Sequence, residues 1–202
     1  MKHKTSNTIA LTVGIAVVFS LLFLLIPPTF AQQGKTSQAA PSAQHKQALA
    51  TFDKHVKDYV KLREGLEGKM PKLPDKSTPE RIEAHKNAFE DSVRAARAGA
   101  KHGDIFSPQI SEYIRAIIRN EFKGKDRLEL RKMVYEADTK GVPLRVNYTY
   151  PDNKELIEMP PTLLLRLPQL PKQMRYRFVN QNMLLVDREN GLIIDYMVNA
   201  IP

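Results

Sequence analysis

Residues 175–198 read RYRFVNQNMLLVDRENGLIIDYMV, and this stretch decides the fold class. Its apolar runs, RYRFV, MLLV and LIIDYMV, are rich in aromatic and branched residues, which favour extended strands. Residues 187–191 separate the last two runs with a sequence typical of a tight turn. The segment is therefore predicted to form a β-hairpin, which becomes three short strands if 180–182 (NQN) also turns. This prediction places Asp187 in a turn and Asp195 on the solvent face of its strand.

An earlier hairpin is predicted over residues 144–159. Apolar residues alternate with polar ones after Pro143, which is the period of a half-buried strand. These residues are Leu144, Val146, Tyr148 and Tyr150. Residues 151–153 (PDN) supply a turn, and 156–159 form the returning arm. The two hairpins together predict an antiparallel sheet of about four or five strands, and the proline-rich residues 160–171 between them favour a short helical turn.

The first half of the folded region repeats apolar residues every three or four positions, which predicts about four helices. They begin near His45, after the capping sequence 77–80 (STPE), after Ser107-Pro108 and at Asp126. The first two are expected to form an antiparallel helical hairpin. The residues predicted to be buried are Ile82, His85 or Lys86, Phe89, Val93 and Ala96 in the second helix, and Leu130, Met133, Val134 and Ala137 in the fourth. The predicted class is α+β, with helices first and a small antiparallel sheet of β-hairpins last.

The N-terminus resembles a bacterial export signal of the Sec type. Lys2 and Lys4 precede an apolar run over residues 9–26, and Thr29 and Ala31 suit a signal peptidase. Cleavage before Gln32 is predicted, and the alternative is an uncleaved anchor in the inner membrane. The predicted organisation is a signal or anchor at 1–31, a flexible linker at 32–44 and a single α+β domain at 45–202, located in the periplasm or secreted.

Composition limits the partners. The chain contains no cysteine, so its stability must come from an apolar core and not from disulfides. Its net charge is +9, and removal of residues 1–31 leaves +7 because that segment holds two lysines and no acid. This excess predicts an anionic envelope polymer or an envelope protein as the partner, although a solvated basic surface also explains it. No nucleic-acid partner is predicted, and membrane contact is expected only through the N-terminal signal or anchor.

Three phrases carry a resemblance to other proteins. They are GDIFSP (103–108), MPPTLLLRLPQLP (159–171) and YRFVNQNMLLVDRENGLIIDY (176–196). The chain resembles small uncharacterised exported proteins of environmental, acidobacteria-like bacteria over most of residues 47–197, which implies envelope localisation and supplies no activity. The final stretch also resembles the closing hairpin of small periplasmic proteins of the nickel and cobalt homeostasis type, which implies metal binding.

Few residues in the sequence suggest chemistry. His102 and Asp104 lie at a junction after a helix, where loops often build sites, and a metal site would need them together with His85. The structural alternatives are that His102 complements the dipole of a helix end and that His85 is partly buried with a local partner. Arg145, Arg175 and Arg177 on the predicted sheet could offer a face to an anionic partner, or simply shield a sheet edge. No catalytic, cofactor or glycine-rich phosphate motif is recognised, so no cofactor is predicted.

Three functions follow as hypotheses. The first is a non-enzymatic binding or scaffold module of the cell envelope. The second is a periplasmic metal-responsive protein that uses His102 and Asp104. The third is a small hydrolase, which would require a cleft where Asp104 meets a histidine or a serine.

Overall fold

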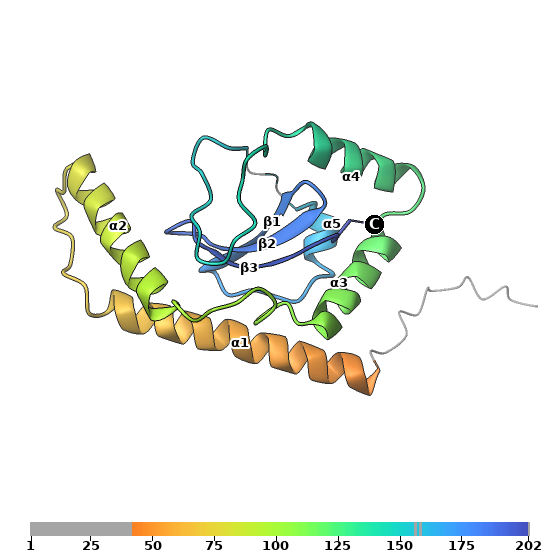
Figure 1. Cartoon of the computed structure of the whole chain (residues 1–202), viewed down its shortest axis with the longest axis horizontal. Helices are drawn as coiled ribbons and strands as arrows, with labels where there is room; N and C mark the ends of the chain where they lie inside the picture. The colour runs from red at the N-terminus through yellow and green to blue at the C-terminus, as the bar shows by residue number, and fades with distance from the viewer. Residues whose placement is uncertain (1–41, 156, 158, 202) are drawn as a thin grey trace, which may run out of the picture. The chain divides into compact units, whose positions relative to one another are not determined.

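Five helices precede a three-stranded antiparallel sheet in the computed structural model, which describes residues 42–155, 157 and 159–201 (Figure 1). The helices are α1 (Ala43–Glu67), α2 (Pro79–Ala96), α3 (Pro108–Glu121), α4 (Lys125–Glu136) and α5 (Pro161–Leu164). The strands are β1 (Met174–Val179), β2 (Asn182–Asp187) and β3 (Ile193–Met197). This order confirms the predicted α+β class. The predicted signal and the linker up to residue 41 lie outside the described residues.

The helix boundaries follow the capping residues. The Ser42 side chain accepts the N–H of His45 at 3.2 Å, so α1 begins two residues before the predicted start. Thr78 caps α2 by accepting the N–H of Arg81, and Pro79 occupies the first turn. α5 is the short helical turn predicted for the proline-rich segment. None of the helices in the described part of the chain has the length and apolar character needed to cross a lipid bilayer.

Apolar residues cover both faces of the sheet. On one face Tyr176, Phe178 and Leu185 pack in the main core with side chains from the helices. The helix residues of this core include Phe52, Val56, Phe89, Val93, Ile110, Ile114, Ile118, Leu130 and Val134. On the other face Leu184, Val186 and Ile193 pack with Val142 and Tyr150 from the segment between α4 and α5. β2 is the central strand, and its residues 183–187 are buried.

The C-terminal stretch forms three strands, as its second turn signal predicted. β1 pairs with β2 from Met174–Asp187 to Val179–Asn182, and β2 pairs with β3 from Met183–Met197 to Val186–Ile193. The turn between β1 and β2 places Asn180 at a positive φ of 50°, a conformation that asparagine tolerates better than most residues. A register irregularity between Leu185 and Val186 interrupts the second pairing.

The predicted first hairpin is wrong. Residues 144–150 form no strand; instead they run beside β3, where Asn147 donates its N–H to the Ile193 carbonyl at 2.8 Å and Ile193 donates to the Tyr148 carbonyl at 2.8 Å. Asn147 has a positive φ of 59°, which breaks the extended conformation. Among the described residues of the returning arm, Ile157 forms an isolated bridge to Phe178. The described sheet therefore has three strands and not four or five.

The buried faces of α2 and α4 are shorter than the sequence predicts. Ile82 is 51% exposed and Met133 is 50% exposed, whereas Phe89, Val93, Leu130 and Val134 are buried as predicted. Figure 1 shows that α2 is inclined to α1 and does not run along the length of that helix. The two helices still contact each other, since the Arg63 guanidinium lies 5.0 Å from the centroid of the Phe89 ring.

The solvent-facing position predicted for Asp195 is also wrong, because this residue is fully buried. Alternation along a strand identifies a solvent face only when one face of the sheet is open, and here both faces are covered. The Asp195 carboxylate is instead satisfied by backbone N–H groups, described below.

Candidate functional site

The loop that carries His102 and Asp104 is held by the buried carboxylate of Asp195. One oxygen of this carboxylate accepts the N–H of Gly103 at 2.9 Å and of Tyr196 at 2.8 Å. The other accepts the N–H groups of Ile105 and Phe106, both at 2.8 Å. Four N–H donors can satisfy one buried carboxylate without a basic side chain. Gly103 has a φ of 87°, which favours glycine at this turn.

Arg97 and Asn147 hold a second segment, residues 144–149, against the end of α2. Arg97 donates from Nε to Asn147 Oδ1 at 3.0 Å, and Asn147 Nδ2 donates to the Arg97 carbonyl at 2.6 Å. Arg97 also donates from Nη2 to the Ile194 carbonyl at 2.7 Å, which ties the pair to β3. This reciprocal pairing fixes the segment although it is not a strand.

A groove of about 1110 Å³ opens between the end of α2 and this segment. We refer to it as the basic groove, and its cationic and aromatic lining consists of Arg94, Lys101, His102, Arg145, Tyr148 and Tyr196. Asp91 also lines it, but the Arg94 guanidinium donates to this carboxylate at 2.7 Å. Within the described part of the chain, neither Lys101 nor Arg145 forms an ion pair. The groove therefore presents positive charge that no acid of the described chain neutralises.

Aromatic rings lie among these cations. The His102 ring stacks on the Tyr196 ring with a centroid distance of 4.1 Å and an interplanar angle of 17°. Tyr148 is 45% exposed although it is large and aromatic. Exposed rings beside basic side chains provide flat apolar surfaces together with hydrogen-bond donors, which suits a ligand that is both ringed and anionic.

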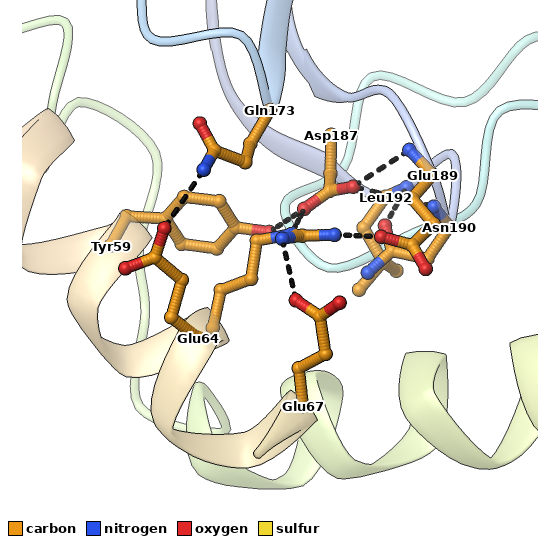
Figure 2. Close-up of polar contacts among 9 residues, drawn as sticks. Tyr59, Glu64, Glu67, Gln173, Asp187, Glu189, Asn190 and Leu192 are labelled. Carbon is orange, nitrogen blue, oxygen red and sulfur yellow. Dashed lines mark hydrogen bonds and ion pairs between the residues drawn. The ribbon is translucent and has the colours of Figure 1, made fainter. Parts of the chain in front are cut away.

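A separate polar cluster is buried between α1 and the turn that follows β2 (Figure 2). Asp187 accepts a hydrogen bond from Tyr59 Oη at 2.6 Å and from Arg63 Nε at 2.9 Å. Arg63 also pairs with Glu67 and Glu189, and the other Asp187 oxygen accepts the N–H of Glu189 at 2.9 Å. Burial and the nearby Asp187 charge raise the pKa of Tyr59 far above its ordinary value. The single Arg63 guanidinium pairs with all three carboxylates, two of which lie on the sheet side, so the cluster locks α1 to the sheet.

The three residues predicted for a metal site are not brought together. His85 lies in α2, where its Nε2 is 3.0 Å from the Pro71 carbonyl oxygen. His102 lines the basic groove, whereas Asp104 lines a different pocket and accepts the N–H of Lys101 at 2.7 Å. In the described ranges no group of three or more histidine, aspartate or glutamate side chains is placed to hold a metal ion.

The three arginines predicted to form one face are divided. Arg145 is exposed and lines the basic groove. Arg175 and Arg177 are half-buried on β1, opposite Val186 and Leu184 of the covered second face. The sequence placed all three on one sheet because it predicted 144–150 as a strand. The missed members of the groove, Lys101 and Tyr196, become visible only when the loop after α2 is known to contact β3.

Comparisons with protein-family models, with curated proteins and with solved structures found no match to this chain.

Proposed function

We propose that this chain is an exported envelope protein that binds an anionic sugar polymer of the envelope in the basic groove, without catalysing a reaction. The observation that carries the proposal is the pair of unneutralised cations, Lys101 and Arg145, beside the exposed ring of Tyr148. Acidic sugars offer carboxylates or phosphates for the cations and flat ring faces for the tyrosines.

The volume of the groove and the fixed position of its two walls both suit a polymer. Its volume of about 1110 Å³ exceeds the range of about 300–1,000 Å³ that is usual for small-molecule sites. Its two walls come from α2 with the following loop and from residues 144–149, which the Arg97–Asn147 pairing joins. Such a fixed, open surface can bind successive units of a chain without reorganisation.

Thr149 supplies the one aliphatic hydroxyl among the residues that line the groove, and this hydroxyl already forms hydrogen bonds. Thr149 Oγ1 donates to Glu90, and the Arg94 guanidinium donates to the same threonine oxygen at 3.1 Å. Glu90 and Arg94 both belong to α2, so these bonds help to fix the groove wall formed by residues 144–149 against that helix.

Export is part of the same proposal. We infer that residues 1–31 direct the chain out of the cytoplasm and that the mature protein begins at Gln32, where the polar linker separates the folded part from the membrane. Mass spectrometry of the N-terminus of protein from a bacterial periplasm tests this inference. A terminus at Gln32 supports it, and an intact Met1 terminus in the membrane fraction would show the anchored alternative.

Binding to a defined acidic polysaccharide tests the proposed ligand class. Polygalacturonate is the anionic probe and dextran is the neutral control. The full chain should bind polygalacturonate but not dextran, and added salt should weaken the binding because it screens exposed charges. A chain that binds both polymers equally, or neither, contradicts the proposal.

Charge reversals then locate the site. The variant Lys101→Glu/Arg145→Glu should weaken polygalacturonate binding by about tenfold or more, because two attractive contacts become repulsive. The matched control is Lys123→Glu/Arg127→Glu, which changes the net charge equally at exposed positions outside the groove. Equal losses in both variants would show attraction to overall charge and not to this groove.

A further inference from the structure

A second pocket lies on the other side of the loop that follows α2. Its volume is about 410 Å³, within the range of small-molecule sites. His55, Tyr59 and Leu62 from one face of α1 form one wall, and Arg97 with Ile105 forms the other. We call it the Arg97 pocket. It shares no lining residue with the basic groove.

Arg97 has N–H donors that no hydrogen bond in the described part of the chain uses. A guanidinium carries five N–H donors. Within the described part of the chain, Arg97 uses one to reach Asn147 Oδ1 and one to reach the Ile194 carbonyl. These two bonds leave both N–H groups of Nη1 and one N–H group of Nη2 unused. The edge of the guanidinium between Nη1 and Nη2 can therefore offer two parallel N–H groups to a carboxylate.

Comparison with Arg63 shows what Arg97 lacks. Both guanidinium groups lie over an aromatic ring, Arg63 over Phe89 at 5.0 Å and Arg97 over Tyr59 at 5.1 Å. Arg63 is neutralised by Asp187, Glu67 and Glu189. Arg97, in contrast, has no carboxylate within ion-pair distance among the described residues. Burial lowers the pKa of Arg97, and the nearby charges of Asp195 and Asp104 offset this only in part. Burial of Arg63 is instead outweighed by its carboxylates, which raise the pKa of that group.

The two acids at the Arg97 pocket already have partners. Asp58 accepts a hydrogen bond from Lys54 Nζ at 2.9 Å, and Asp104 accepts the Lys101 N–H at 2.7 Å. Both residues are exposed, so water screens their charges. Leu62 and Ile105 add apolar surface beside the guanidinium. The pocket thus combines one half-buried cation that no acid pairs with and an apolar wall.

We propose that the Arg97 pocket binds a small organic carboxylate, with its carboxylate on the free edge of the Arg97 guanidinium and its apolar body against Leu62 and Ile105. This site is separate from the polymer site and does not depend on it. The ligand is monoanionic and compact, because one guanidinium receives it and the volume is about 410 Å³.

Benzoate is the probe, and two molecules of the same ring size are its controls. In NMR titrations of the full chain, benzoate should shift the signals of Leu62, Ile105 and the Arg97 side chain. Benzamidine, which carries the opposite charge, and neutral benzyl alcohol should shift them far less. Absence of benzoate shifts at millimolar concentration, or equal shifts with benzamidine, would overturn the proposal.

Variants can distinguish a loss of ligand binding from a loss of folding. Arg97→Gln removes the anion receptor, but it also removes structural hydrogen bonds, so the main test is Leu62→Trp. Leu62 is half-buried and its enlargement fills the pocket, which should weaken benzoate binding by about tenfold or more while the chain stays folded. Asp104→Asn should strengthen binding by about two- to fivefold, because a screened negative charge is removed beside the anion.

The two proposed sites can fail independently. Lys101→Glu/Arg145→Glu should leave benzoate affinity within about twofold of the parent, and Leu62→Trp should leave polygalacturonate affinity unchanged. Unchanged benzoate affinity in Leu62→Trp would place benzoate elsewhere and overturn the Arg97 pocket alone.

Discussion

Asp195 accepts the backbone N–H of Phe106 at 2.8 Å, and this bond joins β3 to the loop that leads into α3. The same carboxylate accepts the N–H groups of Gly103 and Ile105. One buried side chain thus fixes the loop that separates the basic groove from the Arg97 pocket. The loop donors therefore come from the phrase GDIFSP (103–108), and the acceptor comes from LIIDY (192–196).

Asp195→Asn should therefore destabilise the protein strongly. An amide keeps one acceptor oxygen but places an NH₂ group against backbone donors, which leaves buried N–H groups unpaired. We expect the free energy of unfolding to fall by about 3 kcal/mol, measured by urea denaturation. The control Asp138→Asn removes an exposed carboxylate that pairs with Lys154, and it should cost less than about 1 kcal/mol. Equal losses would contradict the anchoring role of Asp195.

Arg63 is predicted to be essential to the lock between α1 and the sheet. Arg63→Met leaves the buried Asp187 carboxylate without its guanidinium, and we expect a loss of about 3–5 kcal/mol. Tyr59→Phe removes a single hydrogen bond to the same carboxylate and should cost about 1 kcal/mol. The double variant Arg63→Met/Asp187→Asn should lose less than the sum of its singles, because the unpaired charge is gone. Additive losses in this cycle would mean that the two side chains are not coupled.

Stability should decline in alkaline solution. Burial raises the pKa values of Tyr59 and Tyr176 above their ordinary value of 10.0, so the folded state keeps protons that the unfolded state releases. The stabilisation is complete below about pH 10 and falls above it, by about 1.4 kcal/mol per pH unit for each tyrosine. Urea denaturation at about pH 9 and about pH 11 measures this loss. In Tyr59→Phe the loss of unfolding free energy per pH unit should be smaller by the contribution of one tyrosine. An unchanged loss per pH unit would show that Tyr59 does not contribute.

The sequence predicted the elements better than their contacts. Periodicity and capping residues such as Thr78 located the helices, and two turn signals divided the C-terminal stretch into its three strands. The alternation rule predicted a strand at residues 144–150. These residues instead bond to the start of β3 and to the turn before it, and not to a second arm of a hairpin. Their conformation depends on Arg97, which lies about fifty positions earlier, and local sequence carries no information about such a pairing.

Contacts between distant segments also bring together site residues that local sequence does not connect. His102 and Arg145 were singled out from the sequence, and the structure places both in one groove. Lys101 and Tyr196 join them only because Asp195 draws the loop onto β3. Arg97 gave no sequence signal, since its chemical interest lies in the absence of an acid partner among the described residues, a property of three-dimensional packing.

The most direct test of the central claim is an NMR map of the binding surface, recorded with a short oligogalacturonate added to the isotopically labelled protein. We expect amide shifts at Lys101, at His102 and over residues 145–149, with little change in α4. Shifts concentrated on α4, or none at an oligomer concentration that saturates binding, would contradict the assignment of the basic groove as the site for an anionic polymer.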